Sequence, residues 1–348
     1  MIAALEVEGF RGFRRLKVEG LGRVNLIIGR NNSGKTALME AMAIAADVST
    51  TAFSLVSLQE NRLPNAHVQD FNRFWLPLFL DGKADNGFTI VASMVGGPKH
   101  SVNVRRGEAP HDITVKSRTR TPLSGLWTIE IKAAVGERFQ NDRITANSET
   151  INLPAVLDPH SYAWWWVRSN KGIEPLDIQS FSDIKQMGRE SLLLDVLRQV
   201  DSRLSSIDLL APTGDHAELF VRLGPNAPLL NMAMMGDGFQ RCFEFGVAAA
   251  ATAAPSLLID EFENGLHHSV LEPIWHWLAS VSVTRKLQIF ATTHSEECVQ
   301  AACRAFTAAG DDGLRVIRLD QREEETVATV YDRSLVEAAT QMGVEIRG

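Results

Sequence analysis

The chain has 348 residues, of which 45% are hydrophobic and 22% are charged, and its formal net charge is −7. This length is enough for one large domain or for two lobes that share a core, and the composition is that of an ordinary soluble globular protein. The acidic balance argues against a surface that is basic all over, but it leaves room for a local basic groove that binds nucleic acid.

The N-terminal residues predict two strands, a third buried strand and a helix. Residues 2–8 alternate apolar and polar side chains, as a half-buried strand does, and residues 16–18 predict a second strand. Residues 24–28 are a short apolar run that stops at Gly29, which indicates a buried strand that feeds a loop. A helix rich in alanine, leucine and methionine is expected over residues 36–46.

The loop between this strand and this helix, residues 29–36, reads Gly-Arg-Asn-Asn-Ser-Gly-Lys-Thr. Its glycines allow backbone N–H groups to surround phosphate oxygens, and the helix behind them points its positive end at the same oxygens. Lys35 would reach the β- and γ-phosphates of ATP, and Thr36 would bind Mg²⁺. A chance glycine-rich turn is the alternative, but the strand before the loop and the helix after it are the context that phosphate binding requires.

The next part of the chain predicts a β subdomain. The apolar residues 71–79 are interrupted by Pro77, which predicts the end of a helix that packs on the core. From Gly87 to about Ile151, strand-like runs alternate with glycine-containing turns, so we expect an antiparallel β subdomain. The strand-like runs are residues 88–95, 101–104, 113–116 and 127–133.

After this β subdomain, the sequence becomes rich in aromatic residues and then in residues at helical spacing. Tyr162 and the three tryptophans after it, residues 164–166, form an aromatic cluster that we expect in the core or at an oligomer seam. Residues 184–204 carry leucine and valine at helical spacing and predict one helix, an arm or lid. Residues 207–210 and 219–223 predict a hairpin that returns the chain to the core.

Gly236, Asp237 and Gly238 precede a helix of small residues that is expected over residues 239–253. Two glycines at the start of a helix can form a second anion-binding N-terminus. The structural alternative is an N-cap formed by Asp237 with Gly236 in the turn, and both interpretations can hold together.

Residues 256–259 predict an apolar strand that ends in Asp260 and Glu261. Asp260 at the strand tip suits water-mediated binding of Mg²⁺, and Glu261 is placed to polarise an attacking water. A buried strand that ends in an acidic turn is common and would be a weak signal by itself. The phosphate loop upstream makes it a strong one.

His294 follows another short apolar strand, residues 286–291. A single histidine near a strand end is usually a structural residue. At this offset after the acidic pair, however, a neutral imidazole could hydrogen-bond the γ-phosphate or the attacking water. Two more strands, residues 314–319 and 326–331, and a last helix, residues 334–342, complete the expected elements.

No feature of the sequence predicts export or a membrane span. The three cysteines, Cys242, Cys298 and Cys303, lack CxxC spacing, which favours a reducing compartment without disulfides. The N-terminus has no basic segment before an apolar core, and the longest charge-free apolar run, residues 245–259, is too short to cross a bilayer. We therefore expect a cytoplasmic protein without a membrane partner.

The order of these motifs resembles that of the ABC-type ATPase heads of the SMC, RecF and OLD (overcoming lysogenization defect) group. Residues 8–13, Glu-Gly-Phe-Arg-Gly-Phe, resemble the FRSF segment before the phosphate loop in those proteins. Residues 263–267, Glu-Asn-Gly-Leu-His, resemble the D-loop of OLD-like AAA family ATPases found in prokaryotic defence loci. The resemblance covers residues 1–48 and 207–348 and leaves the middle unmatched.

This resemblance implies an α/β P-loop NTPase fold, an ABC-ATPase-like two-lobe head with an antiparallel β subdomain and a helical insert. The expected domains are an N-terminal ATPase lobe over residues 1–150, a helical insert or lid over residues 151–206, and a C-terminal ATPase lobe over residues 207–348. The C-terminal lobe would carry the signature, the acidic strand end, the D-loop and the switch histidine.

The resemblance also implies that two copies enclose two ATP molecules head to tail, as a homodimer or a higher homo-oligomer. Glu261, His294 and Lys35 would be catalytic, and Thr36 and Asp260 would hold Mg²⁺. Contacts to ATP are implied for Arg11, Asn31, Asn32, Ser33, Gly34, Lys35, Thr36, Ala37, Gly236, Asp237 and Gly238.

One position departs from the ABC pattern. Asp237 stands where a serine is usual, and its carboxylate would repel the γ-phosphate unless it caps backbone N–H groups or pairs with Arg241. This departure bears on whether the second copy activates hydrolysis. For the glutamine of the Q-loop, Gln59 and Gln69 are the two candidates.

The function implied is an ATP-driven switch that controls a separate effector, for which a nuclease is one candidate, in anti-phage defence. We expect no intrinsic nuclease, because Asp311 and Asp312 lie in a plain loop. One alternative is a RecF-like DNA-binding repair ATPase, and another is a scaffold in which ATP is structural; a nucleotide kinase is poorly supported. The DNA-binding alternative needs a basic groove, for which the local cluster is Arg105, Arg106, Lys116, Arg118 and Arg120, although such a cluster is more often a solvated face.

Overall fold

The computed structural model describes residues 1–108, 126–147, 149–154, 164–169, 175–212, 214, 216–251, 255–323 and 325–336. The chain forms two compact units. Unit 1 comprises Met1–Leu21, Asn31–Ala163 and Leu319–Thr329, and unit 2 comprises Gly22–Arg30, Trp164–Arg318 and Val330–Gly348. This division differs from the three domains expected from the sequence, because the third strand belongs to unit 2 and the boundary between the units falls inside the phosphate loop.

Unit 1 is built on a seven-stranded sheet in which every neighbouring pair is antiparallel. The predicted antiparallel β subdomain is therefore confirmed, and the N-terminal hairpin belongs to the same sheet. The strand expected over residues 113–116 lies outside the described residues. In sheet order, the strands are β2 (Phe13–Glu19), β1 (Ile2–Phe10), β4 (Phe88–Met94), β5 (His100–Gly107), β6 (Trp127–Val135), β7 (Arg138–Ala146) and β8 (Ile151–Asn152).

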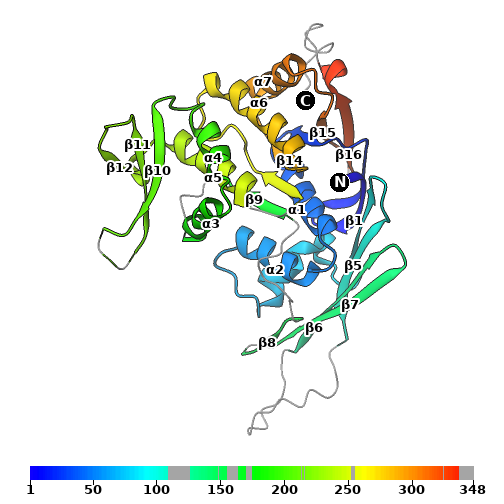
Figure 1. Ribbon diagram of the computed structural model, residues 1–348. Helices are drawn as coiled ribbons and strands as arrows, with labels where there is room; N and C mark the ends of the chain where they lie inside the picture. Colours follow the sequence, from blue (N-terminus) through cyan, green and yellow to red (C-terminus); the bar gives the residue numbers. More distant parts are fainter. Residues whose placement is uncertain are drawn as a thin grey trace. The chain divides into compact units, whose positions relative to one another are not determined.

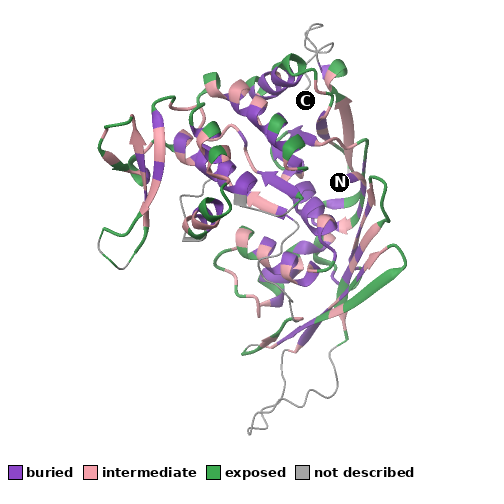
Figure 2. Cartoon of the chain, viewed as in Figure 1, coloured by how far each residue is buried: buried purple, intermediate pink, exposed green. Residues whose placement is uncertain are grey.

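Strand β7, like the short strand β8 beside it, was not predicted from the sequence. Its first four residues are all exposed, as the green stretch in Figure 2 shows, so they carry no alternation of apolar and polar side chains. The strand is specified instead by its full register against β6, which runs from Val135 opposite Arg138 to Trp127 opposite Ala146. Pairing with a neighbour, rather than pattern, makes this segment a strand.

Two helices pack on the sheet of unit 1. Helix α1 (Lys35–Ala46) contacts β1, β4 and β5, and helix α2 (Thr51–Arg62) contacts β6 and β7. The apolar segment that follows forms short turns rather than the end of a long helix. These turns are the π-helix η1 (Phe71–Trp75), capped by Asp70, and the 3₁₀ helices η2 (Leu76–Leu78) and η3 (Leu80–Gly82). Pro77 in η2 lacks the N–H group that a longer helix would need.

Unit 2 contains most of a six-stranded sheet, of which four neighbouring strands are parallel. The parallel strands are buried almost throughout, which explains their nearly continuous apolar sequences. In sheet order, the strands are β16 (Glu325–Asp332), β15 (Leu314–Arg322), β3 (Val24–Gly29), β14 (Gln288–Thr292), β13 (Ser256–Ile259) and β9 (Trp164–Val167).

Two expectations for the predicted helical insert were wrong. The tryptophan run forms the edge strand β9, which pairs in parallel with β13, so this part of the insert belongs to the core sheet. The single helix expected over residues 184–204 is two helices, α3 (Pro175–Gln186) and α4 (Glu190–Leu197). Gly188 separates them with a φ of 66°, a left-handed conformation that ends α3. Tyr162 lies outside the described residues.

Unit 2 also contains the helices α5 (Asp237–Ala251), α6 (His268–Thr284) and α7 (Glu296–Ala308). Helix α5 packs on α3 and α4, and Gly246 permits the close approach, because a Cβ there would lie 2.4 Å from Leu193 Cδ1. Helix α6 packs on α7. None of the helices in the described residues is both long and apolar enough to cross a membrane.

A separate three-stranded antiparallel sheet precedes α5 in the chain. It consists of β10 (Leu204–Leu210), β11 (Glu218–Leu223) and β12 (Leu229–Asn231), and its first two strands confirm the predicted hairpin. Figure 1 shows this sheet apart from β9, with α4 and α5 between them. Of the last predicted helix, residues 334–336 are helical and residues 337–342 lie outside the described part of the chain.

The three cysteines give a prediction about pH. All three are buried and outside any disulfide, and burial raises the pKa of Cys242 and of Cys298 to about 12. The folded protein therefore keeps both thiols protonated at a pH where the unfolded chain, with a thiol pKa near 9.0, ionises. We expect no reaction with iodoacetamide at pH 8 before unfolding, and a fall in the free energy of unfolding as pH rises from 9 towards 12. Rapid native-state alkylation of either cysteine, read by mass spectrometry, would contradict this.

Candidate functional site

The carboxyl ends of three parallel strands meet at one edge of the sheet in unit 2. Strand β14 lies between β3 and β13, with Thr292 opposite Ile27 on one side and Ala291 opposite Ile259 on the other. The next residues on these strands are therefore neighbours, and Thr293 N–H donates to the carbonyl of Ile27 at 3.1 Å. The first residue of the phosphate loop, the acidic pair and the histidine all leave the sheet at this edge, where open α/β sheets bind ligands.

The remainder of the phosphate loop, from Asn31, belongs to unit 1 and opens helix α1. Asn32 and Gly34 have φ angles of 64° and 94°, so the loop uses left-handed backbone twice. Gly34 is the N-cap of α1 and no side chain caps the helix, which leaves its N-terminal N–H groups to an anion.

Ser33 and Lys35 line this loop with polar groups. Both residues are buried, and the Ser33 hydroxyl has no hydrogen-bond partner. A buried hydroxyl without a partner is costly unless a ligand completes it. The uncapped helix and this hydroxyl fit a bound phosphate chain. Asn31 and Asn32 are exposed, Thr36 is half-buried, and Ala37 is buried inside α1.

The surroundings of Gly34 predict the effect of replacing it by alanine. A Cβ at this position would lie 2.6 Å from two ring atoms of Phe13, and the φ of 94° is unfavourable for alanine. We expect Gly34→Ala to lower the free energy of unfolding by about 1–3 kcal/mol and to abolish nucleotide binding, because the loop must move off the ring. Urea unfolding and titration with a fluorescent ATP analogue measure the two effects. Gly12→Ala is the matched control, since its Cβ would meet nothing within 4 Å. Equal affinities of the two variants would refute this explanation.

Arg11, for which the resemblance implies a contact with ATP, lies in a network of buried polar groups. It adopts a φ of 52°, is buried, and forms an ion pair with Glu40 of α1, with Nη2 also donating to Gln59 Oε1 at 2.6 Å. Burial lowers the pKa of Arg11, and the nearby Glu40 carboxylate offsets this. Removing one partner of such a buried pair costs about 3–5 kcal/mol, so the pair fixes α1 on the β1–β2 turn. Arg11 thus joins the β1–β2 turn to α1, and its contact with ATP stays a prediction.

The same network of buried polar groups holds the side chain of Gln59, one of the two Q-loop candidates. Its side chain is buried, accepts from Arg11 and donates to the carbonyl of Phe74. The other Q-loop candidate, Gln69, accepts through its backbone carbonyl a hydrogen bond from Trp127 Nε1 at 2.9 Å. Gln59 is therefore held in a structural role.

At the sheet edge of unit 2, Thr292 connects the acidic pair to the histidine strand. Its Oγ1 donates to Asp260 Oδ1 at 2.7 Å and accepts from the Glu261 N–H at 2.8 Å. Its carbonyl accepts from the Phe262 N–H at 2.9 Å. The sequence motif contained Thr292, but only the pairing of β13 with β14 reveals this role.

His294 is held by the D-loop. Its backbone N–H donates to Glu263 Oε1 at 2.8 Å, so a carboxylate three residues after Asp260 positions the segment that carries the imidazole. The structure thus brings together Asp260, Glu261 and His294, which the sequence predicted as parts of one site. It adds Glu263 and Thr292 as the groups that fix their spacing.

The start of α5 differs from the alternative in which Asp237 is the N-cap of this helix. The helix begins at Asp237, and the Gly236 carbonyl accepts from the N–H groups of Phe239 and Gln240 at 2.9 and 3.2 Å, so Gly236 takes the N-cap position. Asp237 is exposed in the first turn. Its carboxylate lies at the favourable end of the helix dipole.

The two glycines around Asp237 differ in their environments. A Cβ at Gly238 would lie 2.8 Å from the carbonyl oxygen of Gly265 in the D-loop, whereas a Cβ at Gly236 would meet nothing within 4 Å. Packing within one copy therefore explains why residue 238 is a glycine. Arg241 does not pair with Asp237, because its guanidinium is engaged by Glu244 at 3.3 Å and by backbone carbonyls at the acidic strand end.

The two residues predicted to bind Mg²⁺ belong to different units. Thr36 belongs to unit 1 and Asp260 to unit 2. Among the described residues there is no group of three or more histidine, cysteine, aspartate or glutamate side chains that could hold a metal ion. A magnesium ion that arrives with ATP phosphates needs only one or two protein ligands, so the assignment of Thr36 and Asp260 stays a prediction.

One described member of the predicted basic cluster, Arg105, is paired with an acidic residue. Arg105 donates to Glu130 Oε2 at 2.9 Å, and Arg143 donates to Glu130 Oε1 at the same distance. The hydrogen bond from Arg105 lowers the pKa of Glu130 below its ordinary value. Arg106 lies over the ring of Phe71. Residues 116, 118 and 120 lie outside the described part of the chain.

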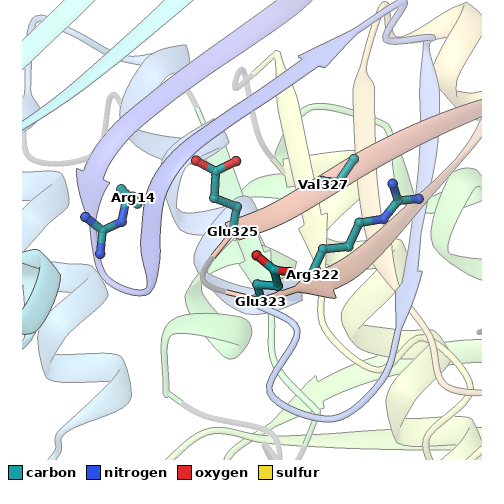
Figure 3. A pocket seen from close by; sticks show the side chains of 5 residues that line it. All are labelled: Arg14, Arg322, Glu323, Glu325 and Val327. Atoms are coloured by element: carbon teal, nitrogen blue, oxygen red, sulfur yellow. The ribbon is translucent and has the colours of Figure 1, made fainter.

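A hollow of about 580 Å³ lies in unit 1 and is lined by residues of opposite charge. Figure 3 shows Arg14 on the β1–β2 hairpin, with its side chain directed away from Glu325 and Glu323 at the β15–β16 turn. All four charged residues are exposed. Their charges balance on an open surface, so this hollow lacks the field that would select an anion. Its remaining lining residues are Arg322 and Val327.

Comparisons with known proteins agree with this geometry. The model of the family described as "AAA domain, putative AbiEii toxin, Type IV TA system" matches residues 24–299. A Helicobacter pylori protein named ATP/GTP phosphatase is 23% identical over 330 residues, which cover 86% of this chain and 87% of that protein.

Two solved structures share the fold. The Smc head domain of Pyrococcus furiosus, solved with an extended coiled coil and bound to the C-terminal domain of ScpA, has a TM-score of 0.51 and 11% identity, covering 100% of this chain and 99% of that one. A Smc head bound to the C-winged helix domain of ScpA has a TM-score of 0.50 and 11% identity, covering 98% and 99%. At this identity the likeness establishes the fold alone. It confirms the predicted α/β, ABC-type P-loop head.

Proposed function

We propose, because the chain belongs to this family of AAA domains, that it binds ATP with Mg²⁺ at the phosphate loop and hydrolyses it with Glu261 as the base. The observation that carries the proposal is the shared sheet edge, at which β3, β14 and β13 deliver the phosphate loop, His294 and the acidic pair. The name of the Helicobacter pylori relative, ATP/GTP phosphatase, supports the same reaction.

Each group would have one role in this reaction. Backbone N–H groups of residues 31–36 and Lys35 bind the phosphates, and Thr36 and Asp260 hold Mg²⁺, which neutralises phosphate charge when bound. Glu261 accepts the proton of the attacking water. His294 hydrogen-bonds the γ-phosphate or that water, and the bond from its backbone to Glu263 keeps it at the sheet edge. Thr292 fixes Glu261 and Asp260 on the same strand end.

We further propose that two copies close around ATP, so that the start of α5 in one copy meets the nucleotide held by the other. The open surroundings of Gly236 and its exposed position at a helix N-terminus support this role. Asp237 beside it is exposed and unmatched by Arg241, so its negative charge would oppose closure on the γ-phosphate. We infer slow turnover and a closed state that persists.

The closed and open states would control a separate effector protein in defence. The family's description, which names a putative toxin of a Type IV TA system, supports the part of this proposal that concerns defence. The pairing of Arg105 and Arg143 with Glu130 weakens the alternative of a DNA-binding groove on the β subdomain.

The mass of the protein in solution tests this proposal. We expect the Glu261→Gln protein, which binds ATP without hydrolysing it, to double in mass when ATP and Mg²⁺ are added, as measured by light scattering. Lys35→Ala, which lacks the phosphate contact, is the matched control and should keep the mass of the nucleotide-free protein. If ATP leaves the mass of Glu261→Gln unchanged while the analogue titration shows binding, the dimer is excluded.

A further inference from the structure

The backbone of Glu261 is in a conformation that glutamate rarely adopts. Its φ is 46°, which lies in the left-handed region, and it is one of six non-glycine residues in the described part of the chain with a positive φ. Such a conformation persists only where surrounding groups hold it, and it is frequent at functional sites. The question is which groups hold Glu261.

Hydrogen bonds engage both sides of this residue. Its N–H donates to Thr292 Oγ1 at 2.8 Å, and its carbonyl accepts from Arg241 Nη2 at 3.3 Å. The same Nη2 donates to the carbonyl of Asp260 at 2.6 Å. One guanidinium nitrogen therefore bridges two successive carbonyls, and the carbonyl of Glu261 also accepts from the N–H of Asn264 at 3.0 Å.

Arg241 is itself held firmly. It lies in the second turn of α5, is 5% exposed, and pairs with Glu244 one turn further along the helix at 3.3 Å. Its other terminal nitrogen, Nη1, donates to the carbonyl of Arg168, at the end of strand β9, and the guanidinium lies 5.1 Å from the ring centroid of Phe245. A planar fork with several donors can satisfy this set of acceptors, which the single ammonium of lysine cannot do.

We propose that Arg241 is a positioning residue that holds the backbone of Glu261 in its left-handed conformation and ties that conformation to helix α5. The inference rests on the proposed role of Glu261 in ATP hydrolysis. Helix α5 begins at Gly236 and Asp237, the segment proposed to meet the nucleotide of the other copy. A displacement of α5 on closure therefore moves the carbonyl of Glu261 in the same copy, and with it the carboxylate that activates water.

Two measurements on Arg241→Gln test the inference. Hydrogen exchange with residue resolution follows the amides of Glu261 and Phe262, both of which donate to Thr292. Loss of the carbonyl bridge should speed their exchange by about tenfold or more and leave the amide of Ile289 unchanged. ATP turnover should show a kcat about 10- to 100-fold lower with an unchanged KM, because a charged hydrogen bond that orients the base is lost.

Matched variants separate positioning from general damage. Arg285→Gln removes another arginine that donates to a carbonyl of α5, that of Ala249, at 3.3 Å. Ala249 lies near the opposite end of α5 from Arg241. It should change neither exchange at Glu261 nor kcat. Arg241→Lys keeps the charge without the fork, serves as the test variant if Arg241→Gln does not fold, and should show the same two effects.

Three results would overturn the inference: unchanged exchange at Glu261 and Phe262, unchanged kcat despite faster exchange, or the same losses in Arg285→Gln. If the wild-type protein hydrolyses no ATP, the proposed function fails, and the exchange measurement alone decides whether Arg241 holds this turn.

Discussion

Replacing Glu261 by glutamine is expected to lower ATP turnover by about 10²- to 10⁴-fold, the usual contribution of a general base, while ATP still binds. The amide has nearly the shape of the carboxylate but cannot accept the proton of the attacking water. The backbone contacts of Glu261 to Thr292 and Arg241 do not involve its side chain, so the fold should be unaffected. Phosphate release under saturating ATP and a thermal melt measure the two properties.

Glu272→Gln is the matched control for this change. Glu272 lies in α6, and its carboxylate bonds Arg304 at 2.7 Å on the surface, where ion pairs contribute little. Its turnover should equal that of the wild type. Turnover that survives in Glu261→Gln would remove Glu261 as the base and favour the scaffold in which ATP is structural.

Replacing Phe262 by alanine is expected to lower the free energy of unfolding by about 3–5 kcal/mol. Phe262 is fully buried and stacks between Phe245 and Trp275, with ring centroids 5.3 and 4.0 Å away and interplanar angles of 16° in both cases. Alanine would leave a cavity between α5 and α6 and release the segment that follows Glu261. Urea unfolding measures the loss, and turnover should fall together with it.

Phe139→Ala is the control for Phe262→Ala. Phe139 is 78% exposed on β7, so removing its ring deletes little buried surface and should change the free energy of unfolding by less than about 0.5 kcal/mol. Phe262→Leu, which refills most of the cavity, should lose less than the alanine variant. A loss in Phe262→Ala no larger than that in Phe139→Ala would show that the stacked rings do not hold the acidic strand end.

The motifs were predictable because each is short, contiguous and carries its own context. The phosphate loop sits between an apolar strand and a helix, and Asp260 and Glu261 end an apolar strand. The pairing of β3, β14 and β13 confirms that these strand ends share one edge. Parallel strands read as apolar runs wherever both faces are buried. The fold class followed from the resemblance of the motif order to the ABC-type ATPase heads.

The errors arose where pattern and pairing disagree. The run of tryptophans has no alternation, and only pairing with Ser256–Ile259 makes it strand β9. Leucine spacing continues across Gly188 although the left-handed backbone there ends α3. The sequence also did not reveal that a buried glutamate on α1, Glu40, binds the guanidinium of Arg11. Strand β9 and the ion pair of Arg11 depend on partners distant in sequence, whereas the backbone at Gly188 itself ends α3.

The sequence by itself determined the chemistry available to this protein: a loop for phosphates, two carboxylates, a histidine and a glycine pair at a helix start. Local geometry dictates these groups, so short segments record them. Only the tertiary structure decided how they are held: Thr292 between Asp260 and Glu261, Glu263 on the backbone of His294, and Arg241 on the carbonyl of Glu261. All but one of these bonds join a side chain to a backbone group of another segment, and the type of a residue does not reveal which side chain its backbone will meet.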